Sequence, residues 1–185
     1  TPQTRDLIRR LNLAAITVLN NKGGVLPLHP DLKEVAILNV GDGGKTEPFD
    51  REIKKYIPFA RFQLRKDLPE AEQQKLRDSL AAYRRVIVTV TEQRLAPYQS
   101  FFARFAPEAP AIYVFYTPAK SMLQIQRAVS AAEAVVLAHA PHDEVQERVA
   151  DILFGKATAD GRLSASVGGL FSAGSGLTIT PHTPF

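Results

Sequence analysis

The stretch EVAILNVGDGGKTEPFDREIKKY, residues 34–56, decides the fold class of this chain. It opens with a continuous apolar run over residues 34–40, which is typical of a strand covered on both faces. A glycine-rich turn follows, and then a segment in which Phe49, Ile53 and Tyr56 recur at helical spacing. A strand, a tight turn and a helix in this order form the repeating unit of a parallel sheet.

The glycine-rich turn invites comparison with a phosphate-binding loop, G-x-x-x-x-G-K-[ST], whose successive N–H groups wrap a phosphate. The letters GKT at residues 44–46 fit the end of this pattern, but the opening glycine would have to be Asn39. The apolar runs at 84–91 and 134–140 end without the acidic residue that would hold a metal ion. We therefore interpret the segment as a tight strand-to-helix turn, in which glycine supplies unusual backbone angles.

The middle of the chain repeats this alternation of strand and helix. Apolar runs predict strands over 60–66, 84–91, 111–117 and 134–140, and helical periodicity predicts helices over 69–83, 96–106, 121–131 and 143–154. We expect an α/β fold built as a three-layer sandwich: a mainly parallel sheet of about five strands with helices on both faces, in a flavodoxin-like arrangement.

The N-terminal segment carries a separate helical pattern. Leu7, Ile8 and Leu11 begin a spacing that continues to Leu19, and the polar residues and glycine at 20–23 form a stop signal. The pattern predicts one amphipathic helix that reaches this stop and buries these side chains.

The C-terminal part has its own signals. Asp143 and Gln146 are spaced as a capping box at the start of the last helix, and Gly155 stands where a C-terminal glycine belongs. Beyond it, Gly, Ser, Ala and Thr predominate, which predicts an extended C-terminal tail with a short edge strand at 163–167. We divide the chain into a domain over 1–170 and a tail or linker over 171–185.

Composition narrows the class of protein. The chain has 185 residues, enough for one domain, with 45% hydrophobic residues and a net charge of +4. The basic residues are scattered among acidic ones, whereas nucleic acid binding requires a basic stripe, so we expect no nucleic acid partner. There is no cysteine, which excludes disulfides, thiol catalysis and Cys-based zinc sites. No apolar run approaches the ~20 residues of a membrane helix, and no signal peptide is recognisable.

Motifs at both ends resemble those of a known family. The letters ILFG at 152–155 and DGRLSAS at 160–166 resemble the closing segment of the C-terminal α/β-sandwich domain of glycoside hydrolase family 3. The letters AITVLNNKGGVLPL at 15–28 are similar to the family's entry motif. The resemblance covers nearly the whole chain, with one departure: Ser164 stands where the family usually has proline.

The resemblance implies a division of labour between domains. Members are retaining exo-β-glycosidases in which an N-terminal barrel, absent from this chain, supplies a nucleophilic Asp. In the β-glucosidase branch the sandwich lends a Glu as acid/base from an E-G-x-D-R-type loop. Here the corresponding loop, within VTVTEQRLAPYQ at 88–99, is short and lacks that signature. In the β-N-acetylhexosaminidase branch an Asp–His pair on a barrel loop does this work, so the short loop favours that branch.

The same resemblance supplies expectations about partners and location. We expect a covalently linked N-terminal barrel domain and a glycan substrate from peptidoglycan or chitin. The ending at 174–184 is similar to a junction with a following serine-hydrolase domain. The resemblance implies no cofactor, and it favours an exported, periplasmic bacterial location. Since the chain opens directly into a helix without an initiator Met, it looks like part of a longer polypeptide.

Candidate site residues follow strand ends, where ligands bind in open α/β sheets. Glu92 is the candidate acid/base, and it is placed by analogy with the family. Asp42, His139 and His142 are candidate substrate-binding residues, although Asp42 also suits a glycine turn. The letters HAPHDE at 139–144 suggest a metal site, but a metal needs three or four placed ligands and no further ligand can be named, so we assign no metal.

A second hypothesis belongs to a different class. Because no complete catalytic set is visible within the chain, the alternative to the glycosidase domain is a flavodoxin-like α/β binding or interaction module without catalytic activity. Fold alone cannot decide between this and a glycosidase domain that is inactive by itself.

Overall fold

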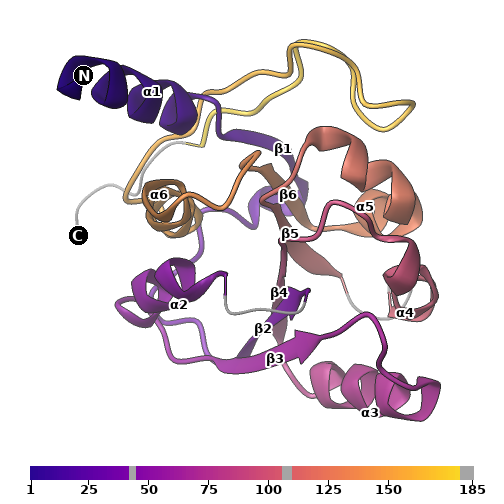
Figure 1. The fold of residues 1–185 in the computed structure, drawn as a ribbon. Coiled ribbons are helices and arrows are strands. Elements are labelled where there is room, and N and C mark those ends of the chain that lie inside the picture. The colour runs from indigo at the N-terminus through magenta and orange to yellow at the C-terminus, as the bar shows by residue number, and fades with distance from the viewer. Residues whose placement is uncertain (42–44, 106–109, 180–185) are drawn as a thin grey trace.

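The computed structural model describes residues 1–41, 45–105 and 110–179 (Figure 1). Within this part of the chain, six strands form one sheet in the order β1-β6-β5-β4-β2-β3. The strands are β1 (Thr17–Asn21), β2 (Val35–Val40), β3 (Ala60–Leu64), β4 (Arg85–Val90), β5 (Ala111–Phe115) and β6 (Ala134–Leu137). Strands β2 to β6 pair in parallel, and β1 joins the edge antiparallel to β6.

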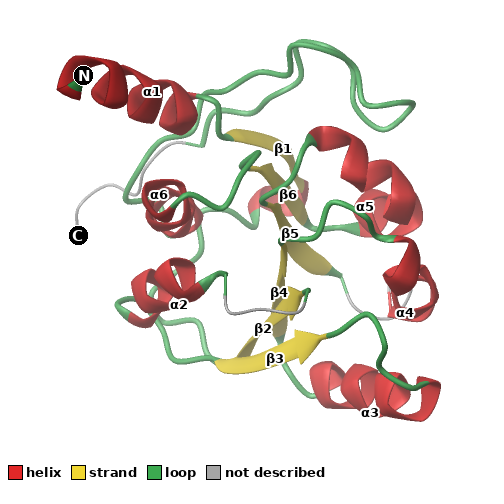
Figure 2. Cartoon of the chain, in the orientation of Figure 1, coloured by secondary structure: helices red, strands yellow, loops and turns green. Residues whose placement is uncertain are grey.

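Helices cover both faces of this sheet (Figure 2). The α-helices are α1 (Pro2–Ala14), α2 (Glu47–Lys54), α3 (Glu70–Ala81), α4 (Gln99–Phe105), α5 (Gln126–Ala131) and α6 (Asp143–Leu153). Short 3-10 helices are η1 (Lys22–Gly24), η2 (Ala96–Tyr98) and η3 (Ala119–Ile125). Helices α2 and α6 lie on one face and α3, α4 and α5 on the other, so the predicted three-layer sandwich is confirmed (Figure 1).

Two apolar cores hold the layers together. Successive residues of a strand point to opposite faces, so Ile37 joins the core under α2 and α6, while Leu38 joins the core under α3, α4 and α5. On the first face Phe49 and Ile53 of α2 are fully buried, as the helical spacing in the sequence predicted. The phenylalanines of α4, including Phe101, fill the second core. Burial on both faces explains why the central strands are continuous apolar runs.

The prediction of one helix over the whole N-terminal segment is wrong. The helix ends at Ala14, and Thr17–Asn21 forms β1, which pairs with β6 from Thr17 opposite Leu137. The β-branched run Ile16-Thr17-Val18 favours a strand, and pairing with β6 overrides the helical spacing. The sheet therefore has six strands where about five were expected.

Helix α1 also fails to bury the residues that the pattern placed inward. None of its residues is buried, and Leu7, Ile8 and Leu11 are 51%, 51% and 60% exposed. The helix touches the body of the domain near α6, where Leu13 packs against the core (Figure 1). Its apolar side therefore faces away from the domain. None of the described helices is both long and apolar enough to cross a bilayer.

The predicted capping box is wrong, because Gln146 serves another purpose. Its side chain is fully buried: Oε1 accepts a hydrogen bond from the Phe49 N–H (3.2 Å), and Nε2 donates to the carbonyl oxygens of Lys45 (2.7 Å) and Pro141 (2.8 Å). The N-cap of α6 is His142, with no side-chain capping bond. Gln146 thereby ties the start of α6 to the start of α2.

The described part of the tail, residues 156–179, is extended, as predicted, and crosses the β1 end of the sheet (Figure 1). The edge strand expected at 163–167 does not form. Instead Leu163 exchanges backbone hydrogen bonds with Gly174 and Ser175 across a loop, and Leu177 bridges to Val18 of β1. The tail thus covers the free edge of β1, which would otherwise expose unpaired backbone groups.

Candidate functional site

The carboxyl ends of the parallel strands meet at one edge of the sheet. Gly41 follows β2, Glu92 lies two residues after β4, and His139 lies two residues after β6. Because β1 is antiparallel, its beginning at Thr17 lies at the same edge, opposite the end of β6. Ligands of open α/β sheets bind at this edge, so the candidate site is built here.

Glu92 lies half-buried across the end of β2. A Cβ atom added at Gly41 would lie 3.1 Å from Glu92 Cγ and 3.4 Å from Oε1. Gly41 has φ +140°, so both its backbone angle and this close approach require glycine. Among the described residues the carboxylate has no hydrogen-bond or ion-pair partner. The structure therefore places Glu92 at the edge as predicted and leaves its role as a prediction.

A buried polar network fixes the adjoining ends of β2, β3 and β4. Asn39 is completely buried; its Nδ2 donates to Thr89 Oγ1 (3.0 Å), and its Oδ1 accepts from Gln63 Nε2 (2.8 Å). Gln63 also donates to the Gly41 carbonyl oxygen, which anchors the start of the glycine turn. The sequence analysis did not predict this network, although Asn39, a polar residue between Leu38 and Val40 of the apolar run, was its signal.

An ion pair lies beside this network. Arg61 Nε is 2.7 Å from Asp50 Oδ2, and only 14% of the Asp50 side chain is exposed. Burial raises the pKa of the Asp50 carboxyl, and the neighbouring Arg61 partly opposes that shift. The pair joins α2 to β3, so its role is to hold the helix over the strand ends.

His139 lies at the opposite side of the edge, in a strained backbone conformation. Its φ of +71° is uncommon for a residue other than glycine. The ring Nε2 lies 3.1 Å from the Ala15 carbonyl oxygen. His139 also lines a pocket of about 490 Å³ together with Lys120 and tail residues 162–168. This pocket combines the ends of β5 and β6 with the tail.

The remaining predicted residues do not join that pocket. His142 is exposed at the N-cap of α6 and does not line it. Asp42 lies outside the described residues. In the described ranges, no group of three or more His, Asp or Glu side chains is arranged to hold a metal ion.

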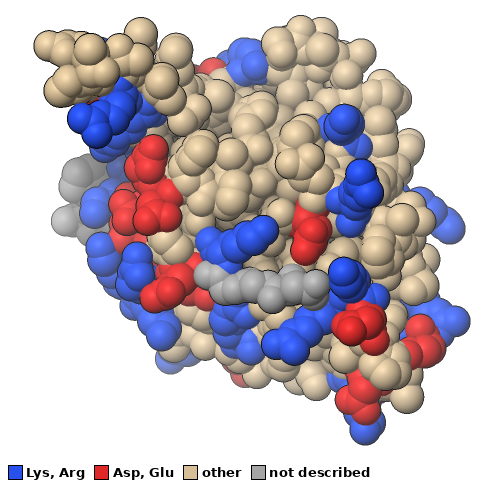
Figure 3. All heavy atoms as spheres, viewed as in Figure 1, with Lys and Arg blue, Asp and Glu red and all other residues tan. Residues whose placement is uncertain are grey.

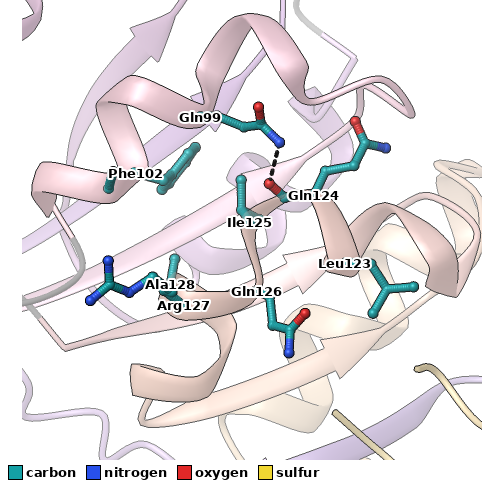
Figure 4. Close-up of a pocket in the computed structure, with 9 residues that line it drawn as sticks. Gln99, Phe102, Leu123, Gln124, Ile125, Gln126, Arg127 and Ala128 are labelled. Atoms are coloured by element: carbon teal, nitrogen blue, oxygen red, sulfur yellow. Dashed lines mark hydrogen bonds between the residues drawn. The ribbon is translucent and has the colours of Figure 1, made fainter. Parts of the chain in front are cut away.

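A second hollow of about 270 Å³ lies between α4 and the η3–α5 segment (Figure 4). Gln99 Nε2 donates to the Gln124 carbonyl oxygen (2.7 Å) across it, and Phe102 and Ile125 supply apolar walls. Leu123 lines this hollow and also lines the pocket beside His139. The two hollows are therefore neighbours separated by one side chain.

Charges on the visible face are mixed. Figure 3 shows Lys and Arg interspersed with Asp and Glu over α2, β3, α3 and α6, while much of the remaining surface on this face is uncharged. On this face, among the described residues, no continuous basic stripe is present of the kind that nucleic acid binding requires.

These features define a doubly wound α/β sandwich whose candidate site is the carboxyl edge of its sheet. The sequence matches no protein-family model and no curated protein sequence. Among solved structures, a fungal multi-domain GH3 β-N-acetylglucosaminidase is similar over 98% of this chain, with a TM-score of 0.70 and 13% identity. A β-glucosidase from Listeria innocua is similar over 90% (TM-score 0.65, 15% identity). A glycoside hydrolase family 3 β-N-acetylglucosaminidase from Paenibacillus sp. str. FPU-7 is similar over 87% (TM-score 0.63, 13% identity).

The likeness concerns one part of each of these proteins. This chain covers 21% of the fungal protein, 27% of the Listeria protein and 32% of the Paenibacillus protein. At such low identity the comparison establishes a shared fold. That fold occurs as a region of much longer glycosidases, which include members of glycoside hydrolase family 3.

Proposed function

We propose that this chain is the accessory C-terminal domain of a retaining exo-β-glycosidase of glycoside hydrolase family 3. The observation that carries the proposal is the agreement of two independent features. The motifs at 15–28 and 152–166 resemble the start and end of that domain, and the fold likeness extends over 98% of the chain. The chain would then be joined to an N-terminal barrel, would serve a glycan substrate and would need no cofactor.

The carboxyl groups at this edge of the sheet support the proposal that the chain depends on another domain for catalysis. A retaining glycosidase uses two carboxyl groups about 5–5.5 Å apart across the scissile bond. At the described edge, Glu92 is the one carboxylate that the family analogy places, and we assign no nucleophile to the described residues. We therefore infer that the chain is inactive alone and that the barrel contributes the nucleophilic Asp.

The loop after β4 supports the β-N-acetylglucosaminidase-like branch. Only residues 91–95 separate β4 from η2, and their letters TEQRL do not reproduce the E-G-x-D-R signature of the β-glucosidase branch. In this proposal the acid/base work belongs to a barrel loop, and Glu92 lines one wall of the sugar site. The solved structures of similar fold include enzymes of both kinds, so the loop alone argues for the branch.

The exposed side of α1 supports a covalent neighbour. Leu7, Ile8 and Leu11 are each at least half exposed on one helix, and contiguous apolar surface of this kind marks interaction sites. We propose that the barrel covers this side of α1. A following serine-hydrolase domain and a periplasmic location are further parts of the proposal and rest on the resemblance.

The proposal is tested in the polypeptide encoded by the whole parent gene. We would measure kcat on chromogenic N-acetyl-β-glucosaminide and β-glucoside, with and without Glu92→Gln. The proposal predicts preference for the N-acetyl substrate and a kcat that Glu92→Gln changes little. A loss of about 10²–10⁴-fold would make Glu92 the acid/base and assign the β-glucosidase branch. A parent gene without a barrel would refute the proposal and favour the non-catalytic binding module.

A further inference from the structure

The pocket beside His139 concentrates positive charge. Two cationic side chains, Lys120 at the start of η3 and Arg162 on the tail, line it together with His139 after β6. Its lining in the described part of the chain contains no Asp or Glu. These three residues come from segments far apart in the sequence, so the fold assembles the charge and no local charge run creates it.

Arg162 is held in place without being neutralised. Its Nη1 donates to the carbonyl oxygens of Asp160 (3.1 Å) and Gly161 (3.0 Å), and its Nη2 donates to Thr178 Oγ1 (3.3 Å). These neutral acceptors orient the guanidinium, which keeps its charge. Within the described ranges neither Arg162 nor Lys120 forms an ion pair, so both charges remain available to a ligand.

The hydrogen bond of His139 fixes which ring nitrogen is free. A carbonyl oxygen can only accept, so Nε2 carries the hydrogen that it donates to Ala15. Nδ1 has no partner among the described residues. The left-handed backbone at φ +71° is a strained arrangement of the kind that clusters at ligand sites.

The rest of the pocket is apolar with exposed hydroxyl groups. Leu163 and Val167 of the tail are buried and Leu123 of η3 is partly exposed, and all three line the pocket. The exposed Ser164 and Ser166 lie on the same tail segment. A volume of about 490 Å³ lies within the usual range for small-molecule sites, which are mainly apolar with a few placed polar groups.

We propose that this pocket binds a small organic anion, which is a compact molecule that carries a carboxylate or a phosphate group. Lys120 and Arg162 supply the charge for the anionic group, and His139 and the serine hydroxyls supply hydrogen bonds. The apolar part of this molecule contacts Leu123, Leu163 and Val167. The proposal does not depend on a glycosidase function, because it rests on the lining of the pocket in this chain.

The test is a titration of the ¹⁵N-labelled chain followed by NMR. The probes are D-glucuronate, D-glucose 6-phosphate and neutral D-glucose, which share a ring and differ in the anionic group. We expect saturable shifts of the backbone resonances of 118–120, 139 and 162–168 with at least one anion and none with glucose. Glucuronate alone would identify a carboxylate site and the phosphate alone a phosphate site. Equal shifts with glucose, or no shifts with either anion, would overturn the proposal.

Variants separate this site from general charge attraction. Lys120→Gln should weaken anion binding by about three- to five-fold, as expected for one exposed charge. His139→Asn should also weaken it, and asparagine tolerates the left-handed backbone. Lys33→Gln makes the same charge change at an exposed position just before β2, at the opposite edge of the sheet, and should change nothing. Equal weakening by Lys120→Gln and Lys33→Gln would overturn the proposal, as would binding unchanged in both pocket variants.

Discussion

Gly161 offers a sharp test of how the tail is seated on β1. A Cβ atom at this position would lie 2.5 Å from the Ile16 carbonyl oxygen and 2.6 Å from Thr17 Oγ1, whereas ordinary contacts are 3.4–4 Å. The nearest atom belongs to the backbone that leads into β1, so no flexible side chain can move aside. We expect Gly161→Ala to push the tail off β1 and to lower the free energy of unfolding by about 1–3 kcal/mol.

Urea unfolding of the variant and the parent chain measures this loss. For a chain of this size each 1 kcal/mol corresponds to about 2–4 °C in Tm, so thermal unfolding gives a second readout. Gly169→Ala is the matched control in the same tail, because a Cβ there meets nothing within 4 Å. It should change stability by less than about 0.5 kcal/mol. Equal stability of the two variants would refute the close approach of the tail to β1.

Four further predictions concern two tyrosine hydroxyl groups, a buried carboxyl and an exposed helix. Tyr113 is fully buried and its hydroxyl has no partner in the described part of the chain, so Tyr113→Phe should stabilise the fold by about 1 kcal/mol in urea unfolding. Tyr56→Phe should destabilise it by a similar amount, about 1 kcal/mol, because the Tyr56 hydroxyl donates to Asp151 at 2.7 Å. Burial raises the pKa of Asp50 above its ordinary 3.8, so its stabilising contribution is complete below that value and is lost as the pH rises through the raised pKa. The stability of the parent chain relative to Asp50→Asn should therefore fall as the pH rises from about 4 to about 7, and a constant difference would contradict this. Leu11→Ser on the exposed side of α1 should change the free energy of unfolding by less than about 0.5 kcal/mol; a larger loss would mean that the Leu11 side chain packs on the domain.

The central strands could be predicted because the pattern that identifies each of them lies within one short stretch of the sequence. Strands β2, β4, β5 and β6 are buried on both faces, so each is a continuous apolar run bounded by turns or helices. The weaker β3 was also found, since its exposed edge position still leaves a recognisable extended segment at Ala60–Leu64.

The N-terminal segment shows where local patterns fail. Leu7, Leu11 and Val18 fit one helical face, but Val18 enters the sheet and the two leucines stay exposed. Pairing with β6 is a contact between residues about 120 positions apart, and periodicity contains no information about it. The prediction for Gln146 was wrong for the same reason, because Lys45 and Phe49, its partners at the start of α2, lie about 100 residues away.

The candidate site was predictable only where it follows strand ends. Glu92 and His139 could be placed at the carboxyl edge because parallel strands end on the same side of a sheet. Lys120 and Arg162 were not predicted as site residues, because the pocket exists only when the tail folds back beside η3. The left-handed backbone of His139 likewise has no signature in the sequence.

The central claim is that this chain is a dependent part of a larger glycosidase. The most direct measurement is hydrolysis of chromogenic N-acetyl-β-glucosaminide by this chain alone and by the polypeptide of its whole parent gene. We predict no turnover by the chain and turnover by the longer polypeptide. Turnover by the chain alone that Glu92→Gln abolishes would contradict the account, because the whole site would then lie within these residues.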